Sequence, residues 1–186
     1  VAVGYAALNT LNAGADAYNT AVGYAAANVM TTGTQNTLIG GLSGDALTTG
    51  SLNVAVGYGA LSTDDLGSQS VALGRNALGA QNYASATNSL NTAVGYEAGL
   101  SVTTGVNNTL IGGQAGDALT DADFNVALGY AALSSDTLGS KSVAIGVQAL
   151  VSQNFTGASD VFNVAIGHQA GIAVTTGTLN TFIGGL

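Results

Sequence analysis

The sequence predicts an all-β protein, a parallel β-solenoid of about eleven coils. Three observations predict it: a motif glycine that returns at a fixed period, a short alternating segment before each of these glycines, and 28 Gly combined with no Pro. A fixed period is the sequence signature of a repeat architecture, in which each coil stacks on its neighbours. Residues 1–186 are therefore expected to form one solenoid segment.

The period is read from the glycine that ends each motif. Most successive glycines differ by 17 in residue number, with one interval of 19 and two of 21: Gly4, Gly23, Gly40, Gly57, Gly74, Gly95, Gly112, Gly129, Gly146, Gly167 and Gly184. Three units of 17 and one of 21 make a longer repeat with a period of 72. Helical repeats need about 33 to 47 residues, so the shorter period excludes them. The additional residues, within 77–91 and 149–163, are expected to bulge from the return turn.

Each unit contains one predicted strand, such as residues 19–23 with the sequence Asn-Thr-Ala-Val-Gly. Its second and fourth residues share one face, and the third lies on the other. The second is Thr or Val and the fourth is Val, Ile or Leu, which favours the pleated conformation. We expect this face to form the core and the Ala-rich third position to face outward. Leu38, Leu110 and Phe182 interrupt the Ala row and are predicted to contact other chains.

Two other positions of the repeat are predicted to have structural roles in the coil. Asn, replaced by Ser in every fourth unit, begins each motif: Asn19, Asn36, Asn53, Ser70, Asn91, Asn108, Asn125, Ser142, Asn163 and Asn180. Stacked amides can hydrogen-bond to one another and to the bend, which predicts a structural ladder. A glycine stands three residues before many of them, at Gly33, Gly50, Gly67, Gly105, Gly139 and Gly177. We expect positive φ at these glycines.

A further column follows the motif glycine and carries Tyr5, Tyr24, Tyr58, Tyr96, Tyr130 and His168. These rings could lie over the smaller residues between them and shield the core. They could also form an exposed row whose faces stack on sugar rings, a possible ligand-facing ladder. Both alternatives stay open from the sequence. Because His168 is the chain's one histidine, it cannot form a histidine-based metal or catalytic cluster by itself.

Two strings carry a family resemblance: Ser-Val-Ala-Leu-Gly at residues 70–74 and Ser-Val-Ala-Ile-Gly at residues 142–146, each followed three residues later by Ala77 or Ala149. They resemble the repeats of YadA-like trimeric autotransporter adhesin heads. The other units resemble related repeats of bacteriophage tail fibres. The resemblance implies a left-handed parallel β-roll in a side-by-side homotrimer. It also implies an extracellular, cell-surface or virion location and a cell-surface glycan or protein receptor.

The composition argues against several other functions. Two basic residues face ten acidic ones, with a net charge of −8, so nucleic acid is not an expected partner. No apolar stretch reaches the roughly 18 residues that a membrane span needs. We find no nucleophile with a base, carboxylate pair or metal cluster and expect neither an enzyme nor a cofactor. The acidic residues are expected in turns, where a Ca²⁺ ion between Asp121 and Asp136 is a minor alternative.

The sequence thus predicts a rigid spacer and display surface in a homotrimeric fibre. The chain begins and stops inside its motif, so it is expected to be part of a longer fibre protein, and its uncapped ends suggest a self-assembling extracellular filament as one alternative. An ice-binding solenoid is the other, based on Thr20, Thr37, Thr92, Thr109 and Thr181 in one column. That column also contains Val and is expected to face inward, which argues against ice binding.

Overall fold

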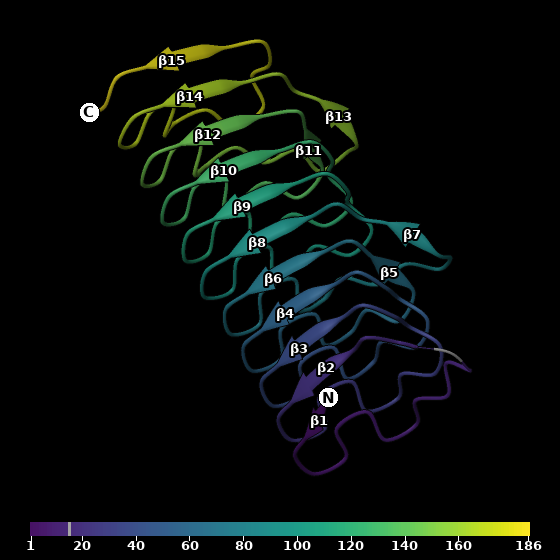
Figure 1. The fold of residues 1–186 in the computed structure, drawn as a ribbon. Helices are drawn as coiled ribbons and strands as arrows, with labels where there is room; N and C mark the ends of the chain where they lie inside the picture. Colours follow the sequence, from purple (N-terminus) through teal and green to yellow (C-terminus); the bar gives the residue numbers. More distant parts are fainter. Residues whose placement is uncertain (15) are drawn as a thin grey trace.

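The computed structural model describes residues 1–14 and 16–186, and this part of the chain forms strands and turns without a helix. One strand per coil joins an eleven-stranded parallel sheet that runs the length of a rod (Figure 1). In sheet order the strands are β1 (Ala2–Val3), β2 (Thr20–Val22), β3 (Thr37–Ile39), β4 (Val54–Val56), β6 (Val71–Leu73), β8 (Thr92–Val94), β9 (Thr109–Ile111), β10 (Val126–Leu128), β12 (Val143–Ile145), β14 (Val164–Ile166) and β15 (Thr181–Ile183). The predicted all-β solenoid is confirmed, and the period of 17 is the length of one ordinary coil.

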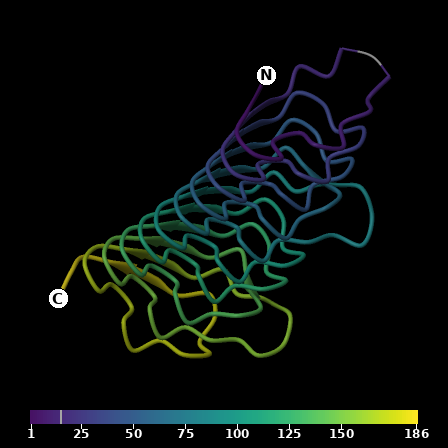
Figure 2. The same ribbon diagram turned by 90° about the horizontal axis from the view of Figure 1, so that it is seen from below.

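Equivalent motif residues lie directly on top of one another. Val22 pairs with Ile39, and Ile39 with Val56, in parallel register. The main chain adds bonds outside the strands, since the motif Gly40 N donates to Val22 O at 2.7 Å and Gly57 N donates to Ile39 O at 2.8 Å. Seen from below, the coils superimpose along the rod (Figure 2). Through this continuous pairing, the main-chain N–H and C=O groups of each coil form hydrogen bonds with the neighbouring coils.

The additional residues of the two longest units leave the main sheet in register. Val71 of β6 still pairs with Thr92 of β8, although the unit between them is one of these two. The excess forms lateral loops, each held by a two-stranded sheet: β5 (Gly67–Ser68) with β7 (Thr87–Asn88), and β11 (Gly139–Ser140) with β13 (Ser159–Asp160). The strands β7 and β13 stand to one side of the stack (Figure 1). The insertions are therefore accommodated outside the coil, as the sequence predicted.

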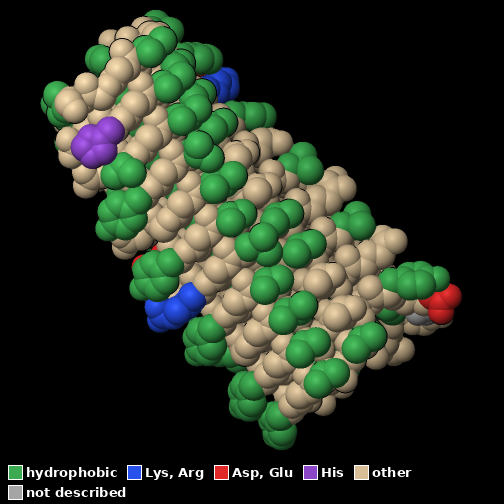
Figure 3. Space-filling model, turned by 60° about the vertical axis from the view of Figure 1, so that its left-hand side comes forward, with side chains coloured by type: hydrophobic (Ala, Val, Ile, Leu, Met, Phe, Trp, Pro, Cys, Tyr) green, Lys and Arg blue, Asp and Glu red, His purple; other side chains and the backbone are tan. Residues whose placement is uncertain are grey.

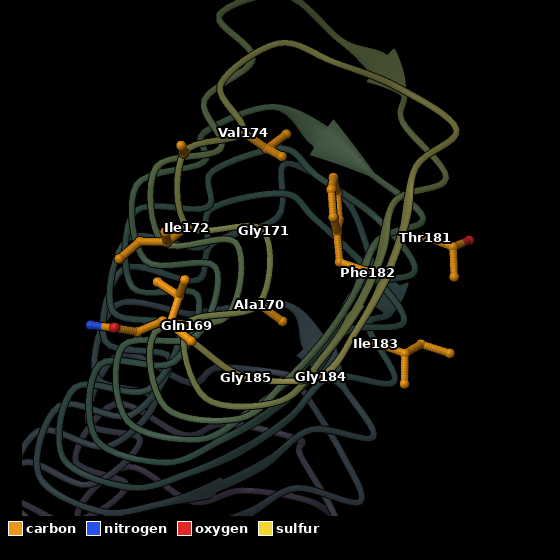
Figure 4. Close-up of a pocket in the computed structure, with 12 residues that line it drawn as sticks. Gln169, Ala170, Gly171, Ile172, Val174, Thr181, Phe182, Ile183, Gly184 and Gly185 are labelled. Carbon is orange, nitrogen blue, oxygen red and sulfur yellow. The ribbon is translucent and has the colours of Figure 1, made fainter.

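The predicted assignment of the two strand faces is wrong. The third position lies inside, where Ala21, Ala55 and Ala72 are fully buried, whereas Ile39 and Leu128 of the fourth position are 37% and 41% exposed. Leu38 and Leu110, predicted as inter-chain contacts, are fully buried within their own chain, and Phe182 packs against the same core. Figure 4 shows this in the last coil, where Phe182 points toward Val174 inside the coil and Thr181 and Ile183 point away.

The physical reason is the volume available inside a narrow coil. Where the strand contributes Leu38, the opposite wall has Gly44, and a Cβ added there would lie 2.9 Å from Leu38 Cδ2. Where the strand contributes Ala55, the wall contributes the fully buried Leu61 instead. One large side chain facing one small one fills such an interior at native density. Two β-branched residues from every strand would overfill it.

Positive φ also occurs at glycines other than those predicted. The motif glycines have it, as at Gly40 (φ 133°), where an added Cβ would overlap the carbonyl oxygen of Gly57 in the next coil. The return-turn glycines 33, 50, 67, 105, 139 and 177 do not have it. They are needed for space, because a Cβ on Gly33 would overlap the carbonyl oxygen of Gly50. The prediction of positive φ at the return-turn glycines is therefore wrong.

Candidate interaction surface

The outward residues of the main sheet form an apolar strip along the rod, which we call the sheet face. Its fourth-position column comprises Val3, Val22, Ile39, Val56, Leu73, Val94, Ile111, Leu128, Ile145, Ile166 and Ile183, all exposed or half-buried. Hydrophobic side chains line up in rows along this side of the molecule (Figure 3). With strands about 4.8 Å apart, eleven strands give a strip about 50 Å long. Nothing in the described part of the chain covers it.

The second-position column lies on the same face. Thr20, Thr37, Thr92 and Thr109 are half-buried there, and Thr181 is exposed. The sequence-based expectation that this column faces the core is wrong, for the same reason of interior volume. The sheet face therefore combines a flat backbone with Thr or Val beside Val, Ile or Leu on every strand.

The aromatic column lies at the carboxyl end of the strands, directly after the bend, and we call it the carboxyl-end margin. Its tyrosines Tyr5, Tyr24, Tyr58, Tyr96 and Tyr130 are 49% to 75% exposed, and His168 is exposed too. In Figure 3 hydrophobic side chains follow one edge of the rod, on which the histidine also lies. These residues are thus displayed along one line, available for stacking from outside.

The rings of this margin also contact their neighbours along the column, so the tyrosines have a packing role within the chain as well. The rings of Tyr5 and Tyr24 are stacked with centroids 5.4 Å apart. A Cβ on Gly41 would lie 3.5 Å from Tyr58 Cδ2, so this ring lies over the glycine. The guanidinium carbon of Arg75 lies 5.5 Å from the centroid of Tyr96, and its Nη1 donates to the Tyr96 hydroxyl at 3.1 Å.

A second column, at the opposite end of the strands, was missed by the sequence reasoning. It consists of the residues directly before the ladder position, which we call the amino-end margin: Tyr18, Gln35, Leu52, Gln69, Leu90, Asn107, Phe124, Lys141, Phe162 and Leu179. All ten have positive φ, between 52° and 64°. Its apolar members are 47% to 76% exposed. The available signal was an apolar residue before the motif in every second unit.

The predicted Asn ladder lies inside the coil, beside the sheet. Asn36 N donates to Asn19 Oδ1 at 2.9 Å, and Asn36 Nδ2 donates to Gly50 O at 3.0 Å. The same pattern joins Asn53 N to Asn36 Oδ1 and Asn125 N to Asn108 Oδ1, both at 2.9 Å. The amides thus tie each coil to the next and satisfy the return turn. Being buried, they are unsuited to bind a ligand.

The ladder is interrupted where Ser replaces Asn, and a buried polar cluster takes its place. Gln81 Nε2 donates to Asp64 Oδ2 at 2.7 Å and to Ser70 Oγ at 2.8 Å, while Asn91 Nδ2 donates to Gln81 Oε1 at 2.9 Å. A second cluster repeats this arrangement with Asp136, Gln153, Ser142 and Asn163. Burial raises the pKa of the Asp64 carboxyl, against the effect of its bonds from Gln81 and Gly67.

Two of the acidic residues that were expected in turns lie inside the coil. Asp64 and Asp136 are fully buried. The predicted Ca²⁺ alternative is not supported, because Asp136 accepts from Gly139 N, Phe155 N and Gln153 Nε2 inside the coil, whereas Asp121 is exposed and bonds to Thr104. Among residues 1–14 and 16–186, no three acidic, Cys or His side chains gather as metal ligands.

The fold and its surface define a class of protein, a parallel β-solenoid with one uncovered apolar sheet face. Comparisons with protein-family models, curated proteins and solved structures gave no match. Within the described residues, the structure also has no helix with the length and apolar character to cross a membrane. The function must therefore be argued from the surface itself.

Proposed function

We propose that this chain is a rigid segment of an extracellular fibre, in which copies associate lengthwise through the sheet face as a homotrimer. The observation that carries the proposal is the sheet face itself, a continuous apolar surface exposed along all eleven strands. Its three-residue strands make a strip about 10 Å wide and about 50 Å long, or about 500 Å², and the exposed Tyr, Phe and Leu side chains of the two margins extend it. Apolar patches of this size are the largest that monomers usually expose, and they often serve as interaction sites.

A rod of this kind suits a spacer or display role. Each coil is tied to the next by sheet bonds and by the buried Asn ladder, so the segment is stiff. The resemblance to adhesin heads and phage tail fibres supports the trimer of left-handed β-rolls, and a place on a cell surface or virion. In this proposal the chain is neither an enzyme nor a carrier of a cofactor.

Contact with a cell-surface glycan or protein receptor is the adhesive part of the proposal. It is supported by the exposed rings of Tyr24, Tyr58, Tyr96 and Tyr130, since aromatic faces offer both apolar area and a polar tip. The net charge of −8 makes nucleic acid an unfavourable partner.

Mass in solution tests the proposal. Light scattering on the purified chain should give three times its 18.0 kDa mass, with little change on dilution. A monomer would overturn the proposed association, and an open-ended distribution of masses would show a self-assembling filament instead.

Ice binding is the second candidate function, because the structure places the Thr column on the flat outward face. The Thr hydroxyls, which Val replaces at β4, β6, β10, β12 and β14, could order water on a rigid sheet, and the same face cannot also be covered by another chain. Thermal hysteresis of a monomeric preparation would support ice binding. Its absence, together with a trimer mass, would remove that candidate.

A further inference from the structure

Bulky residues occupy both margins of the sheet face at every second strand. The pairs, amino-end residue first, are Tyr18 and Tyr24 at β2, Leu52 and Tyr58 at β4, Leu90 and Tyr96 at β8, Phe124 and Tyr130 at β10, and Phe162 and His168 at β14. The strands between them have Gln35 and Gly41 at β3, Gln69 and Arg75 at β6, Asn107 and Gly113 at β9, and Lys141 and Val147 at β12. The two margins alternate in the same phase. The departures are at the two ends of the rod, Tyr5 beside β1 and Leu179 beside β15.

The centre of the sheet face does not alternate in this way. Its fourth position is Val, Ile or Leu on every strand, so two such faces match equally well after a slip of one coil. A uniform pattern specifies register weakly. The margins are different, because a slip of one coil exchanges every bulky pair for a small or polar pair.

The amino-end margin has a second feature, the placing of large apolar residues at a position of the coil where φ is positive. Phe124 and Phe162 have φ of 58° and 54°, a conformation that disfavours residues with a Cβ. Asn tolerates it better, and Asn107 occupies the same column. Yet the two Phe side chains are 53% and 47% exposed. Strained apolar residues held at the surface point to a role outside the chain.

The chain's two cations lie in these margins as well. Arg75 lies beside β6, one coil before Tyr96, and Lys141 lies beside β12, one coil before Phe162, with Lys141 Nζ 5.3 Å from that ring centroid. Each cation thus lies against the aromatic ring of the next coil and adds a charge in place of another apolar ridge. The ridges on alternate coils stay distinct.

We propose that the two margins fix the axial register between neighbouring copies of this chain, permitting offsets of an even number of coils and excluding odd ones. This inference rests on the proposed lengthwise association. Ridges about 10 Å apart, twice the strand spacing, meet the same kind of surface only after two coils. The second-position column distinguishes the even offsets from one another, since it is Thr at β2 and β3, Val at β4 and β6, and Thr again at β8 and β9. An offset of two coils sets Thr against Val, whereas zero offset keeps like residues level.

Disulfide mapping tests the register, because the chain has no Cys. A chain with Val71→Cys is mixed with chains carrying Val54→Cys, Val71→Cys, Thr92→Cys or Thr109→Cys, after unfolding and refolding together. These pairs report offsets of one, zero, one and two coils. In the native background, cross-links at zero offset should exceed those at odd offsets at least tenfold.

A variant with a filled carboxyl-end margin then removes the alternation on that side of the sheet face: Gly41→Tyr, Arg75→Tyr, Gly113→Tyr and Val147→Tyr. It should fold, since Tyr5 and Tyr24 already stack on consecutive coils, and odd offsets should rise toward the even ones. The matched control carries four tyrosines away from the margins. Three replace exposed Thr32, Thr49 and Thr176 in the return turns, and one replaces exposed Thr156 in a lateral loop. This control should keep the native preference in offset.

The outcomes separate the two proposals. A monomer by light scattering, with no cross-links, overturns both the association and the register. A trimer that cross-links equally at odd and even offsets overturns the register alone. A filled variant that keeps the native preference overturns the part of the carboxyl-end margin in the register.

Discussion

Gln81 Nε2 donates to the buried carboxylate of Asp64 at 2.7 Å, from the coil directly above it. The pair occupies the core position at which other coils have Met30, Leu47, Val102 and Leu119. A charge at this depth is tolerated because the amide and Gly67 N, at 2.9 Å, both donate to it.

Replacing Gln81 by Leu should destabilise the chain. The change leaves Asp64 Oδ2 buried without its donor, and we expect a loss of about 2 to 3 kcal/mol in the free energy of unfolding. The double variant Asp64→Leu with Gln81→Leu restores an apolar column and should recover most of that loss. Urea unfolding of the native chain, the two single variants and the double variant gives the coupling free energy between the two side chains. Additive losses would show that the two side chains act independently.

The position of this pair illustrates what the sequence could predict. The motif period places every strand of the main sheet and its register correctly, because stacking repeats each local pattern, but it does not predict the four short strands of the lateral loops. Considered within its own unit, Asp64 is expected in a turn, like the other acidic residues. Aligned on the period, it falls in the column of Leu47 and Leu119, which marks it as interior.

The wrong assignment of the two strand faces has a different cause. Alternation along Thr20, Ala21 and Val22 identifies two faces but does not say which is inside, and apolar character favours the wrong one. The missing information is non-local. Leu38 lies opposite Gly44, and Ala55 lies in the same coil as Leu61, and only such pairings across the coil reveal the interior volume. The amino-end margin was missed because exposed apolar residues leave no periodic core signal.

The stability of the chain should fall as pH rises from acidic toward neutral through the titration of Asp45 and Asp117. Burial raises the pKa of both carboxyls above the ordinary value of 3.8, and Oδ1 of each lacks a partner among the described residues. Because the folded state holds these protons more tightly, their contribution is complete below 3.8 and is lost as pH passes the raised pKa.

The double variant Asp45→Asn with Asp117→Asn isolates this effect. It should match the native chain near pH 3 and be more stable near pH 7, as measured by the urea midpoint at each pH. If the difference is the same at every pH, the two carboxyls do not titrate in the way that burial predicts.

Lysine on the sheet face should dissociate the proposed trimer. Val56→Lys places a charge on the apolar strip, where each copy would face others, and we expect the mass to fall to that of one chain. Val29→Lys is the matched control, since Val29 is 38% exposed against 36% for Val56 but lies in the turn segment after β2. Equal masses for the two variants would locate the interface elsewhere.

Two adjacent glycines should respond differently to alanine. Gly40 has φ of 133°, and its Cβ would overlap the Gly57 carbonyl, so Gly40→Ala should destabilise by about 2 to 3 kcal/mol. Gly41 is not among the positive-φ residues, and the nearest atom to its added Cβ is Tyr58 Cδ2 at 3.5 Å. Gly41→Ala should be close to neutral in thermal unfolding. Equal losses would mean that the motif bend tolerates a side chain.

Phe124→Asn should stabilise the single chain while weakening association. Asn relieves the strain of a positive φ of 58°, and we expect a gain of about 1 kcal/mol in unfolding measured on the monomeric Val56→Lys background. In the native background the same change removes one ridge of the amino-end margin, so the trimer should dissociate at higher protein concentration. The reverse change at the equivalent position, Asn107→Phe, should destabilise the monomer. A Phe124→Asn chain that is less stable as a monomer would show that Phe124 serves its own coil, and the strain would then be no argument for an outside partner.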